Sequence, residues 1–309
     1  MRFKRLDLNL LVALDALLVE RSITRAARRL NLSQSATSGV LSRLREYFED
    51  EVLVQVGRNM ILTPLAQSLC DPVRNVLMQI QSTIETKPAF VPEQSSRHFR
   101  VIASNYPTSV LLADVAQHLS WHAPNVTMEI VALDDAYLEQ LDRGEVDLLI
   151  MPTKYVAPDH PSEVLFEDSY SCVVWSGNTL VGDSLALEQY MALSHVSTTF
   201  GSSRQQPSFE EWFLKSTGHT RRVDITTSDF NTLPQMVIGT NRIATMHRRL
   251  ARMFARYYPL RLLPAPLDIP QMVMTMQWHK FFDKDPSHIW FRDLLRSMAG
   301  SEKMHVDGC

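Results

Sequence analysis

Residues 21–45 read RSITRAARRLNLSQSATSGVLSRLR, and this stretch decides the fold of the N-terminal part of the chain. It contains six arginines and no acidic residue. The rest of the 309-residue chain holds 25 lysines and arginines and all 34 aspartates and glutamates, so the whole chain has a net charge of −3. Arginines gathered in a short segment of a mildly acidic protein are typical of a surface that binds the phosphate backbone of a nucleic acid.

The spacing of apolar residues in this stretch predicts two short helices. Ser22 comes just before Ile23, Ala26, Ala27 and Leu30, so it is expected to cap the first helix. Asn31 and Leu32 interrupt the pattern, and Ser33 is expected to cap a second helix from Gln34 to about Phe48. The stripe that the second helix should bury is Ala36, Val40, Leu41, Leu44 and Phe48. Two helices joined by a turn of this length form a helix-turn-helix, whose second helix enters the major groove of DNA.

The first turns of the second helix carry small hydroxyl and amide side chains. Such groups hydrogen-bond phosphates and base edges, and glutamine can pair with adenine. Gly39 lowers the stability of this helix, which suggests that another backbone approaches it closely. The residues expected to contact DNA are Arg21, Ser22, Arg28, Arg29, Ser33, Gln34, Ser35, Thr37, Ser38, Arg43 and Arg58.

An ordinary amphipathic helix pair with a solvated arginine face is the alternative interpretation. Three neighbouring features weigh against it. Leu8 to Val19 has the length of a scaffold helix, and residues 52–63 alternate around Gly57-Arg58-Asn59 as in a hairpin, with Arg58 at the tip of a wing. Thr63-Pro64 then opens a helix that extends to about Glu85, with proline at its first position.

Residues 1 to about 90 resemble the winged helix-turn-helix and linker helix of LysR-type transcriptional regulators. The matching stretches are LDLNLLVALDALLVERSITRAARRLNLSQSATSGVLSRLR and LTPLAQSL. The opening MRFKRLDLNLLVALDALLVER and the later MVMTMQWHKFFDKDPSHIWFRDLL are similar to the branch that holds NodD-type and NahR-type regulators. The family commonly has Pro where Ser35 stands and often Glu where Arg45 stands. The first departure leaves the start of the recognition helix open, and the second makes that helix more basic.

Length and composition indicate a soluble globular protein of two or three domains. Cys70, Cys172 and Cys309 are an odd, widely spaced set, which favours a reducing compartment without disulfides. The N-terminal segment imitates a secretory signal, but Asp7 and Asp15 interrupt its apolar run and no cleavage site follows. The expected location is the cytoplasm, with no membrane association.

The helix after Pro64 carries an apolar stripe at three- and four-residue spacing. Its members are Leu65, Leu69, Val73, Val76, Ile80 and Ile84. The stripe can pack on its own domain or form a dimer seam, and the family resemblance favours the seam. Two copies of a helix-turn-helix would bind half-sites about one helical turn apart. The two prolines of residues 87–94 indicate a hinge.

From His98 onward, expected strands alternate with expected helices. The strands are FRVIAS (99–104), VTMEIVAL (126–133), VDLLIMP (146–152), SCVVW (171–175), HVSTT (195–199), VDITT (223–227), RIATM (242–246) and VMTMQWH (273–279). Helices are expected at 108–121, 137–141, 185–193, 207–216, 229–238, 247–256 and 287–298. This alternation predicts a parallel sheet with helices on both faces.

LEQLDRGEVDLLIMP resembles the family's effector domain, which is a periplasmic-binding-protein-like pair of α/β lobes. The resulting class is a multidomain α+β protein. Its expected parts are a winged helix-turn-helix (1–63), a linker or dimerisation helix (64–88), a hinge (89–97) and an effector domain (98–300), with lobe I at 98–168 and 269–300 and lobe II at 169–268.

Ligands of open α/β sheets lie beyond the carboxyl ends of strands, where helix N-termini favour an anionic group. The turns that follow two expected strands, together with the end of a late strand, supply the candidate inducer-binding residues. They are Ser104, Asn105, Tyr106, Thr108, Phe200, Ser202, Gln277 and Trp278. The branch resemblance implies a small aromatic inducer, although any one of these residues can equally be an ordinary turn or cap residue.

Signals for an enzyme are weak. The chain has no GxGxxG, GxxxxGK or GxSxG motif. His118 and His122 lie four residues apart but have no acidic or cysteine partner in a metal-binding arrangement, and Asp134-Asp135 is accounted for by a helix start. We therefore expect no catalytic residue, no metal and no cofactor.

The sequence predicts a DNA-binding transcriptional regulator that is switched by an inducer held between two lobes. Its expected partners are double-stranded DNA, a small aromatic or anionic inducer and further copies of itself, as a dimer through the linker helix and then a tetramer, with RNA polymerase as a candidate. The alternative is an exported solute-binding protein with an atypical N-terminal extension. The inducer, the operator and the direction of regulation stay open.

Overall fold

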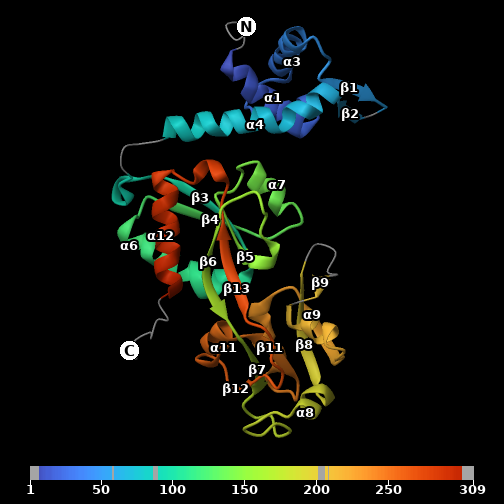
Figure 1. Cartoon of the computed structure of the whole chain (residues 1–309), viewed down its shortest axis with the longest axis vertical. Helices are drawn as coiled ribbons and strands as arrows, with labels where there is room; N and C mark the ends of the chain where they lie inside the picture. The colour runs from blue at the N-terminus through green and yellow to red at the C-terminus, as the bar shows by residue number, and fades with distance from the viewer. Residues whose placement is uncertain (1–6, 58, 86–89, 201–205, 208, 301–309) are drawn as a thin grey trace. The chain divides into compact units, whose positions relative to one another are not determined.

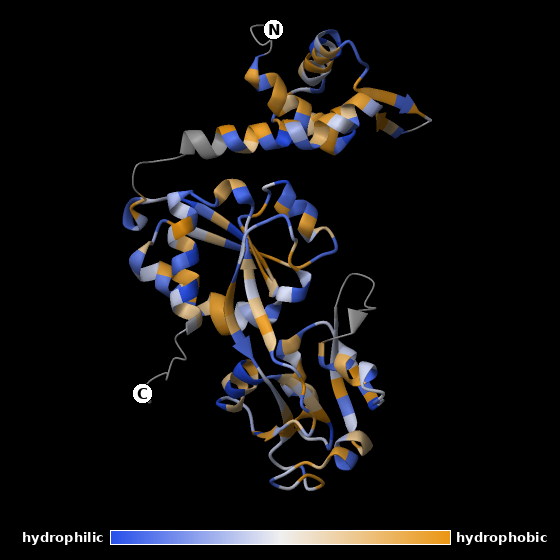
Figure 2. Ribbon diagram, in the orientation of Figure 1, coloured by the Kyte–Doolittle hydropathy of each residue, from blue (hydrophilic) through white to orange (hydrophobic). Residues whose placement is uncertain are grey.

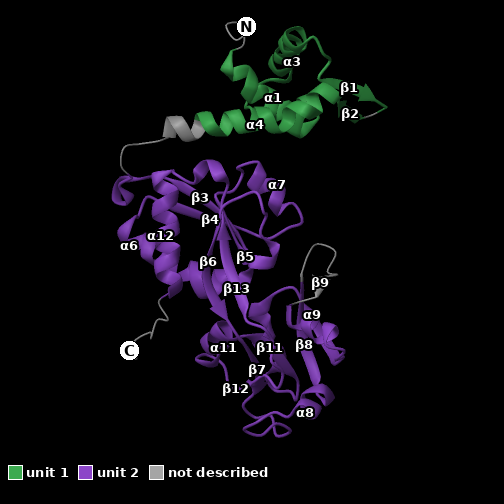
Figure 3. Cartoon of the chain, in the orientation of Figure 1, with its two compact units in different colours: residues 1–87 green, residues 88–309 purple. Residues whose placement is uncertain are grey.

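A computed structural model describes residues 7–57, 59–85, 90–200, 206–207 and 209–300. The chain divides into two compact units, Met1–Lys87 and Pro88–Cys309 (Figure 3). Each unit has its own hydrophobic core. Within the described ranges, no helix has the length and apolar character needed to cross a membrane.

The first unit is a winged helix-turn-helix followed by a long helix (Figure 1). Its elements are α1 (Leu8–Glu20), α2 (Ile23–Arg29), α3 (Gln34–Phe48), β1 (Leu53–Val56), β2 (Asn59–Leu62) and α4 (Pro64–Glu85). The two expected N-caps are confirmed, because the Ser22 hydroxyl accepts from the Arg25 N–H and the Ser33 hydroxyl from the Ala36 N–H. Asn31 turns the chain between the two helices with a φ of 54°, a conformation that asparagine tolerates well.

The buried face of α3 differs from the predicted stripe by one position. Leu41 and Leu44 are buried as expected, but Ala36 is exposed and Thr37 is fully buried in its place. The Thr37 hydroxyl donates to the Ser33 carbonyl at 3.1 Å, so the hydroxyl is satisfied without water. A polar residue can therefore occupy a core position, which an apolar spacing rule does not detect.

The predicted hairpin is confirmed as β1 and β2, which pair antiparallel from Leu53↔Leu62 to Val56↔Asn59. Gly57 has a positive φ of 62°, as the turn requires, while Asn59 is the first residue of β2 rather than a turn residue. Arg58, the expected tip of the wing, lies outside the described residues.

Helix α4 carries hydrophobic and hydrophilic residues along its length (Figure 2), and its apolar residues face two directions. Leu69 and Val73 pack into the core beneath α1, and Arg74 binds Asp15 of α1 at 2.8 Å. Leu65 and Val76 instead remain 39% and 41% exposed. The single predicted stripe is therefore divided between the unit's own core and a free outer face.

The second unit contains two α/β lobes (Figure 1). Lobe I is built on a five-stranded sheet in the order β4-β3-β5-β13-β6, and helices α6 and α12 lie side by side against it. Its elements are β3 (His98–Ala103), α5 (Asn105–Pro107), η3 (Thr108–Leu112), α6 (Ala113–His122), β4 (Thr127–Val131), α7 (Tyr137–Asp142), β5 (Leu148–Pro152), η4 (Thr153–Tyr155), β6 (Ser162–Asp168), β13 (Met272–Gln277), η6 (Lys280–Phe282) and α12 (Pro286–Gly300), with η2 (Pro92–Gln94) before the sheet.

Lobe II is built on a six-stranded sheet, in which β10-β8-β11-β7-β12 form the path and β9 pairs with β8. Its elements are β7 (Tyr170–Trp175), α8 (Leu187–Ala192), β8 (Ser194–Phe200), β9 (Gln206–Pro207), α9 (Phe209–Ser216), β10 (Arg222–Thr227), η5 (Phe230–Thr232), α10 (Leu233–Val237), β11 (Ile243–His247), α11 (Arg248–Ala255) and β12 (Leu260–Pro264). The chain passes between the two sheets after Asp168 and again between Pro264 and Met272.

The prediction of a parallel sheet was wrong in part, because both sheets are mixed. Strand β13 runs antiparallel to β5 and β6, and β7 runs antiparallel to β11 and β12. The edge strands β6 and β12 were not expected at all. The chain crosses twice between the lobes, and the strand that follows each crossing, β7 or β13, runs antiparallel to its neighbours in the sheet that it enters.

Candidate nucleic-acid interface and ligand cavity

Helix α3 presents one continuous exposed face of small and polar side chains. It is formed by Gln34, Ser35, Ser38, Gly39, Ser42 and Arg43. At its start, the Ser33 and Ser35 hydroxyls lie 3.0 Å apart, so Ser35 extends the cap where the family commonly has Pro. A Cβ added to Gly39 would meet no heavy atom of the chain within 4 Å. The close approach expected at Gly39 is therefore not made by this chain's described residues.

Half of the six arginines are neutralised within the first unit. Arg25 lies 3.2 Å from Glu20, and Arg29 lies 3.6 Å from Asp15. Arg45, which was expected to make the recognition helix more basic, lies 3.0 Å from Glu51 and donates to the carbonyls of Glu51 and Leu53. Its guanidinium thus fastens α3 to the wing, and the expectation that it adds to the phosphate-binding charge was wrong.

The other three arginines of residues 21–45 are exposed. Arg28 and Arg43 are exposed and form no ion pair with any described acidic residue. Arg21 is exposed and ends α1 in a left-handed conformation with a φ of 45°. Thr37, which was also predicted to contact DNA, is fully buried and therefore does not belong to the exposed face of α3.

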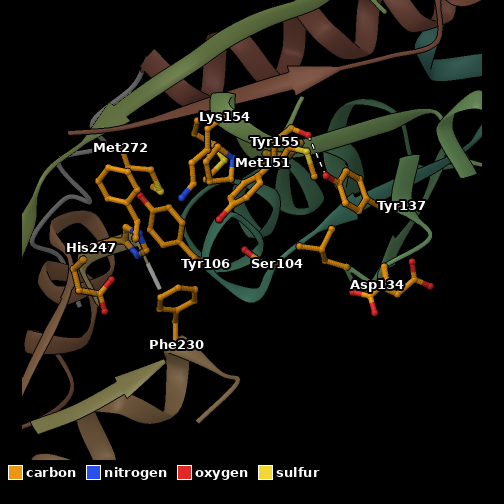
Figure 4. A pocket seen from close by; sticks show the side chains of 17 residues that line it. Ser104, Tyr106, Asp134, Tyr137, Met151, Lys154, Tyr155, Phe230, His247 and Met272 are labelled. Atoms are coloured by element: carbon orange, nitrogen blue, oxygen red, sulfur yellow. Dashed lines mark hydrogen bonds between the residues drawn. The ribbon is translucent and has the colours of Figure 1, made fainter. Parts of the chain in front are cut away.

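A cavity of about 160 Å³ lies between the two lobes of the second unit (Figure 4). Its walls come from the residues that follow β3, β4 and β5 in lobe I and from α9, η5 and β11 in lobe II. The lining residues are Ser104, Tyr106, Leu133, Asp134, Asp135, Tyr137, Ile150, Met151, Pro152, Lys154, Tyr155, Phe209, Glu210, Phe230, His247, Met272 and Met274. Figure 4 shows His247 and Phe230 toward one end and Asp134 and Tyr137 toward the other.

Of the six predicted ligand residues whose side chains the structure describes, two line this cavity, Ser104 and Tyr106. Asn105 instead donates its amide to Asp229, and Thr108 donates to the Ser104 carbonyl at 2.8 Å. The Phe200 side chain and Ser202 lie outside the described residues.

Gln277 and Trp278, the late-strand candidates, lie away from the cavity. The Gln277 amide is fully buried and bonds to the backbone of Ala157 and His160. The Trp278 indole donates to Asp283 at 3.1 Å. Both residues hold lobe I together rather than line the cavity, because β13 runs antiparallel and its carboxyl end lies at the opposite edge of the sheet from the cavity.

The lining residues that the sequence analysis missed follow the same rule that found Ser104 and Tyr106. Leu133 comes just after β4, Lys154 just after β5, and His247 ends β11. All three lie at the carboxyl ends of strands, where α/β proteins bind ligands. Applying the rule to every expected strand would have located them. The helix start at Asp134-Asp135 also has a second role, since both residues line the cavity.

Burial governs the chemistry of the inner end. It raises the pKa of Tyr106 well above the usual range, and the neighbouring Asp168 charge adds to this effect. The Tyr106 hydroxyl donates to the Asp168 carboxylate at 2.6 Å. Burial also lowers the pKa of His247 to about 3, so its imidazole is neutral near pH 7.

Lys154, the one lysine among the described lining residues, lies over aromatic rings. The Lys154 ammonium lies 4.6 Å from the ring centre of Tyr155 and 4.8 Å from that of Phe209, so lobe I reaches lobe II through cation–π contacts. Three carboxylates, those of Asp134, Asp135 and Glu210, line the same cavity. The charge of the lining therefore does not favour an anion, in contrast to the expectation drawn from helix N-termini.

A helix-turn-helix with a free basic face, joined to a two-lobed unit that encloses an apolar cavity, defines a DNA-binding protein that responds to a small molecule. The chain belongs to the LysR family of transcriptional regulators. The family model described as "Bacterial regulatory helix-turn-helix protein, lysR family" matches residues 8–67, and "LysR substrate binding domain" matches residues 92–300. These matches do not favour the alternative of an exported solute-binding protein.

Curated relatives span nearly the whole chain. Nodulation protein D of Bradyrhizobium sp. (strain ANU 289) is 42% identical over 301 residues, which cover 97% of this chain and 89% of that protein. Nodulation protein D 1 of Mesorhizobium japonicum is 44% identical over 299 residues, covering 97% and 95%. Among solved structures, the probable transcriptional regulator PA0477 of Pseudomonas aeruginosa superposes with a TM-score of 0.64 at 28% identity, covering 96% of this chain and 98% of that one.

Proposed function

We propose that this protein reads DNA sequence with the exposed face of α3 and grips phosphates with Arg28 and Arg43. Two observations carry the proposal: the exposed face of α3 is formed by small and polar side chains, and the exposed guanidinium groups of Arg28 and Arg43 form no ion pair with a described acidic residue. Gln34, at the first position of the helix, is the residue proposed to contact a base edge, because the N-terminal turn of a recognition helix points into the groove. Ser35 is the next residue, and Ser38 lies about one turn further along the helix.

The cavity is the proposed inducer site. Its volume of about 160 Å³ is similar to that of an apolar cavity known to hold benzene, about 150 Å³. The side chains of Tyr106, Phe209 and Phe230 provide ring contacts, and the carboxylates disfavour a charged acid. We therefore propose a small, neutral aromatic inducer, which narrows the earlier expectation of an aromatic or anionic one.

Inducer binding is proposed to act through the contacts that join the lobes. Asn105 of lobe I donates to Asp229 of lobe II, and Ser109 donates to Asn231 at 3.1 Å. A ligand can switch the protein only by binding two arrangements with different affinity. These polar contacts adjoin the cavity and are made by short side chains, so they break when the lobes separate slightly.

Self-association is proposed to use the outer face of α4. Leu65 and Val76 are apolar and exposed there, while the inner face of the helix is already packed on α1. A dimer would place two recognition helices on a pseudo-palindromic site. Assembly into a tetramer, contact with RNA polymerase and a cytoplasmic location complete the proposal and follow from the class of protein rather than from a contact described above.

The test begins with a duplex that the full chain selects from random sequence, labelled for fluorescence anisotropy. Gln34→Ala should cost about 1–3 kcal/mol against the selected duplex at one base pair and relax the preference there. Gln67→Ala, an exposed glutamine on α4, is the matched control and should change nothing. Equal weakening by Gln34→Ala on selected and scrambled duplexes would refute the base-reading role, and no affinity for any duplex would refute the function.

A further inference from the structure

The inner end of the cavity is formed by a buried histidine. His247 is the last residue of β11 and is only 3% exposed. Its ring stacks on Tyr106 at a centroid distance of 4.0 Å and meets Phe230 edge-on at 4.9 Å and Tyr170 at 5.0 Å. These rings fix the position of the imidazole without using its nitrogen atoms.

Nδ1 of His247 is buried and has no hydrogen-bond partner among the residues that the structure describes, and Nε2 forms no hydrogen bond to a described residue either. A buried polar atom without a partner lowers the stability of the folded protein, because it loses its hydrogen bonds to water on folding and forms none within the protein. His195 on the adjacent strand β8 shows the usual solution. It is also fully buried, but its Nε2 lies 2.7 Å from the Tyr190 carbonyl. The imidazole of His247 lines a cavity, so its Nε2, the ring nitrogen that is not fully buried, is available to a ligand.

The protonation state of His247 restricts the chemistry of that ligand. Burial alone keeps the imidazole uncharged near pH 7, so it offers one N–H donor and one lone pair. A hydroxyl group is the complement of such a pair of atoms, because it can accept from the one tautomer or donate to the other. A carboxylate can only accept, and it would also meet the carboxylates of Glu210, Asp134 and Asp135.

We propose that His247 is the specificity-determining residue of the cavity and that it hydrogen-bonds the hydroxyl of a neutral phenol. The inference rests on the proposed function for the role of the bound molecule as an inducer, but the contact itself is independent of DNA binding. It assigns the unpartnered polar atoms of the cavity wall to recognition rather than to folding.

Isothermal titration calorimetry of the full chain with p-cresol and with toluene tests the contact, since the two probes differ by one hydroxyl. The wild-type protein should bind p-cresol about tenfold more tightly, the size expected for one hydrogen bond in a dry site. His247→Phe keeps the ring contacts and should abolish the preference. His247→Gln restores a donor and an acceptor and should retain part of it, while His195→Phe should leave it unchanged.

The melting temperatures of the ligand-free variants show whether His247 serves to bind a ligand or to stabilise the fold. His247→Phe removes an unsatisfied polar group, so its melting temperature should rise by roughly 2–4 °C, whereas His195→Phe should melt lower. The proposal is overturned if wild-type protein does not prefer p-cresol, if His247→Phe keeps the preference, or if it melts lower as His195→Phe does. If His247→Phe does not fold, the preference for p-cresol over toluene is measured on His247→Gln instead. A complete loss of the preference in His247→Gln would also overturn the proposal. Anisotropy on DNA reports separately on the proposed function.

Discussion

Arg43 and Arg45 lie two residues apart on α3, and the structure assigns them opposite roles. Arg43 is exposed and has no acidic partner among the described residues, while Arg45 binds Glu51 and two backbone carbonyls. Replacing each by alanine removes the same charge from the same helix. The pair therefore tests whether the free guanidinium groups, rather than the total charge, bind phosphate.

The expected size of the effect follows from counterion release. Each phosphate contact contributes about 0.9 to the slope of log affinity against log salt concentration. A dimer has two copies of Arg43, so Arg43→Ala should make the slope shallower by about 1.8. Between 50 and 200 mM salt, this difference makes the variant's affinity fall about tenfold less than that of the wild type. Arg43→Ala should change the free energy of unfolding by less than about 0.5 kcal/mol, as is usual for an exposed residue.

Arg45→Ala should behave in the opposite way. It removes hydrogen bonds from a charged donor that hold the wing to α3, so it should lower the free energy of unfolding by about 1–3 kcal/mol, with the salt slope unchanged. Fluorescence anisotropy on the selected duplex at five salt concentrations gives the slopes, and urea unfolding gives the stabilities. Equal slopes for Arg43→Ala and the wild type, or a shallower slope for Arg45→Ala, would refute the division of the arginines into free and neutralised groups.

Two further substitutions test local physics. Gly39→Ala should stabilise the first unit by about 0.5–1 kcal/mol in urea unfolding, because the added Cβ meets no atom of the chain and alanine favours the helix. If a DNA backbone approaches Gly39 closely, the same substitution should weaken DNA binding. Unchanged affinity for DNA would exclude that role. Asp147→Asn should cost about 3 kcal/mol at pH 7, because it leaves the buried His288 and Arg97 without their carboxylate. Burial acts to raise the pKa of Asp147, but the hydrogen bond from His288 and the Arg97 charge outweigh it, so the folded pKa is below the unfolded one near 3.9. The stability that the carboxylate provides is therefore present above that pH and lost as the pH falls through the folded pKa, and the deficit of Asp147→Asn should shrink below about pH 4; a constant deficit would contradict this.

Local rules predicted the first unit well. Both helix caps, the hairpin and the proline that opens α4 depend on side chains that act within four residues of their own position. The roles of the arginines could not be predicted in the same way. Arg29 is neutralised by Asp15, 14 positions away on another helix, and the charge count of residues 21–45 does not contain that partner.

In the second unit, the spacing of apolar residues predicted some strands but not the edge strands or the strand directions. The strands with near-continuous apolar runs were predicted, but two edge strands were missed. Strand β6 has the sequence SEVLFED, in which polar and charged residues outnumber apolar ones, and the short apolar run of β12, LRLLP, is interrupted by Arg261 and ends in proline. The cavity was found only at β3. The rule of carboxyl strand ends holds for β4, β5 and β11 as well, but it fails for β13, whose reversed direction is a property of the chain crossing and not of its residues.

The attachment of α4 to α1 has a consequence for the spacing of operator sequences. Val73 is buried in the core and Arg74 forms an ion pair with Asp15 of α1, so α4 is packed rigidly against the helix-turn-helix and is not a flexible linker. In a dimer joined through the outer face of α4, the separation and relative rotation of the two recognition helices would be set by that joint. Inserting one base pair between the half-sites rotates one half-site by roughly 35° around the duplex axis relative to the other. A rigid dimer cannot rotate its recognition helices by the same angle, so it would no longer bind both half-sites at once.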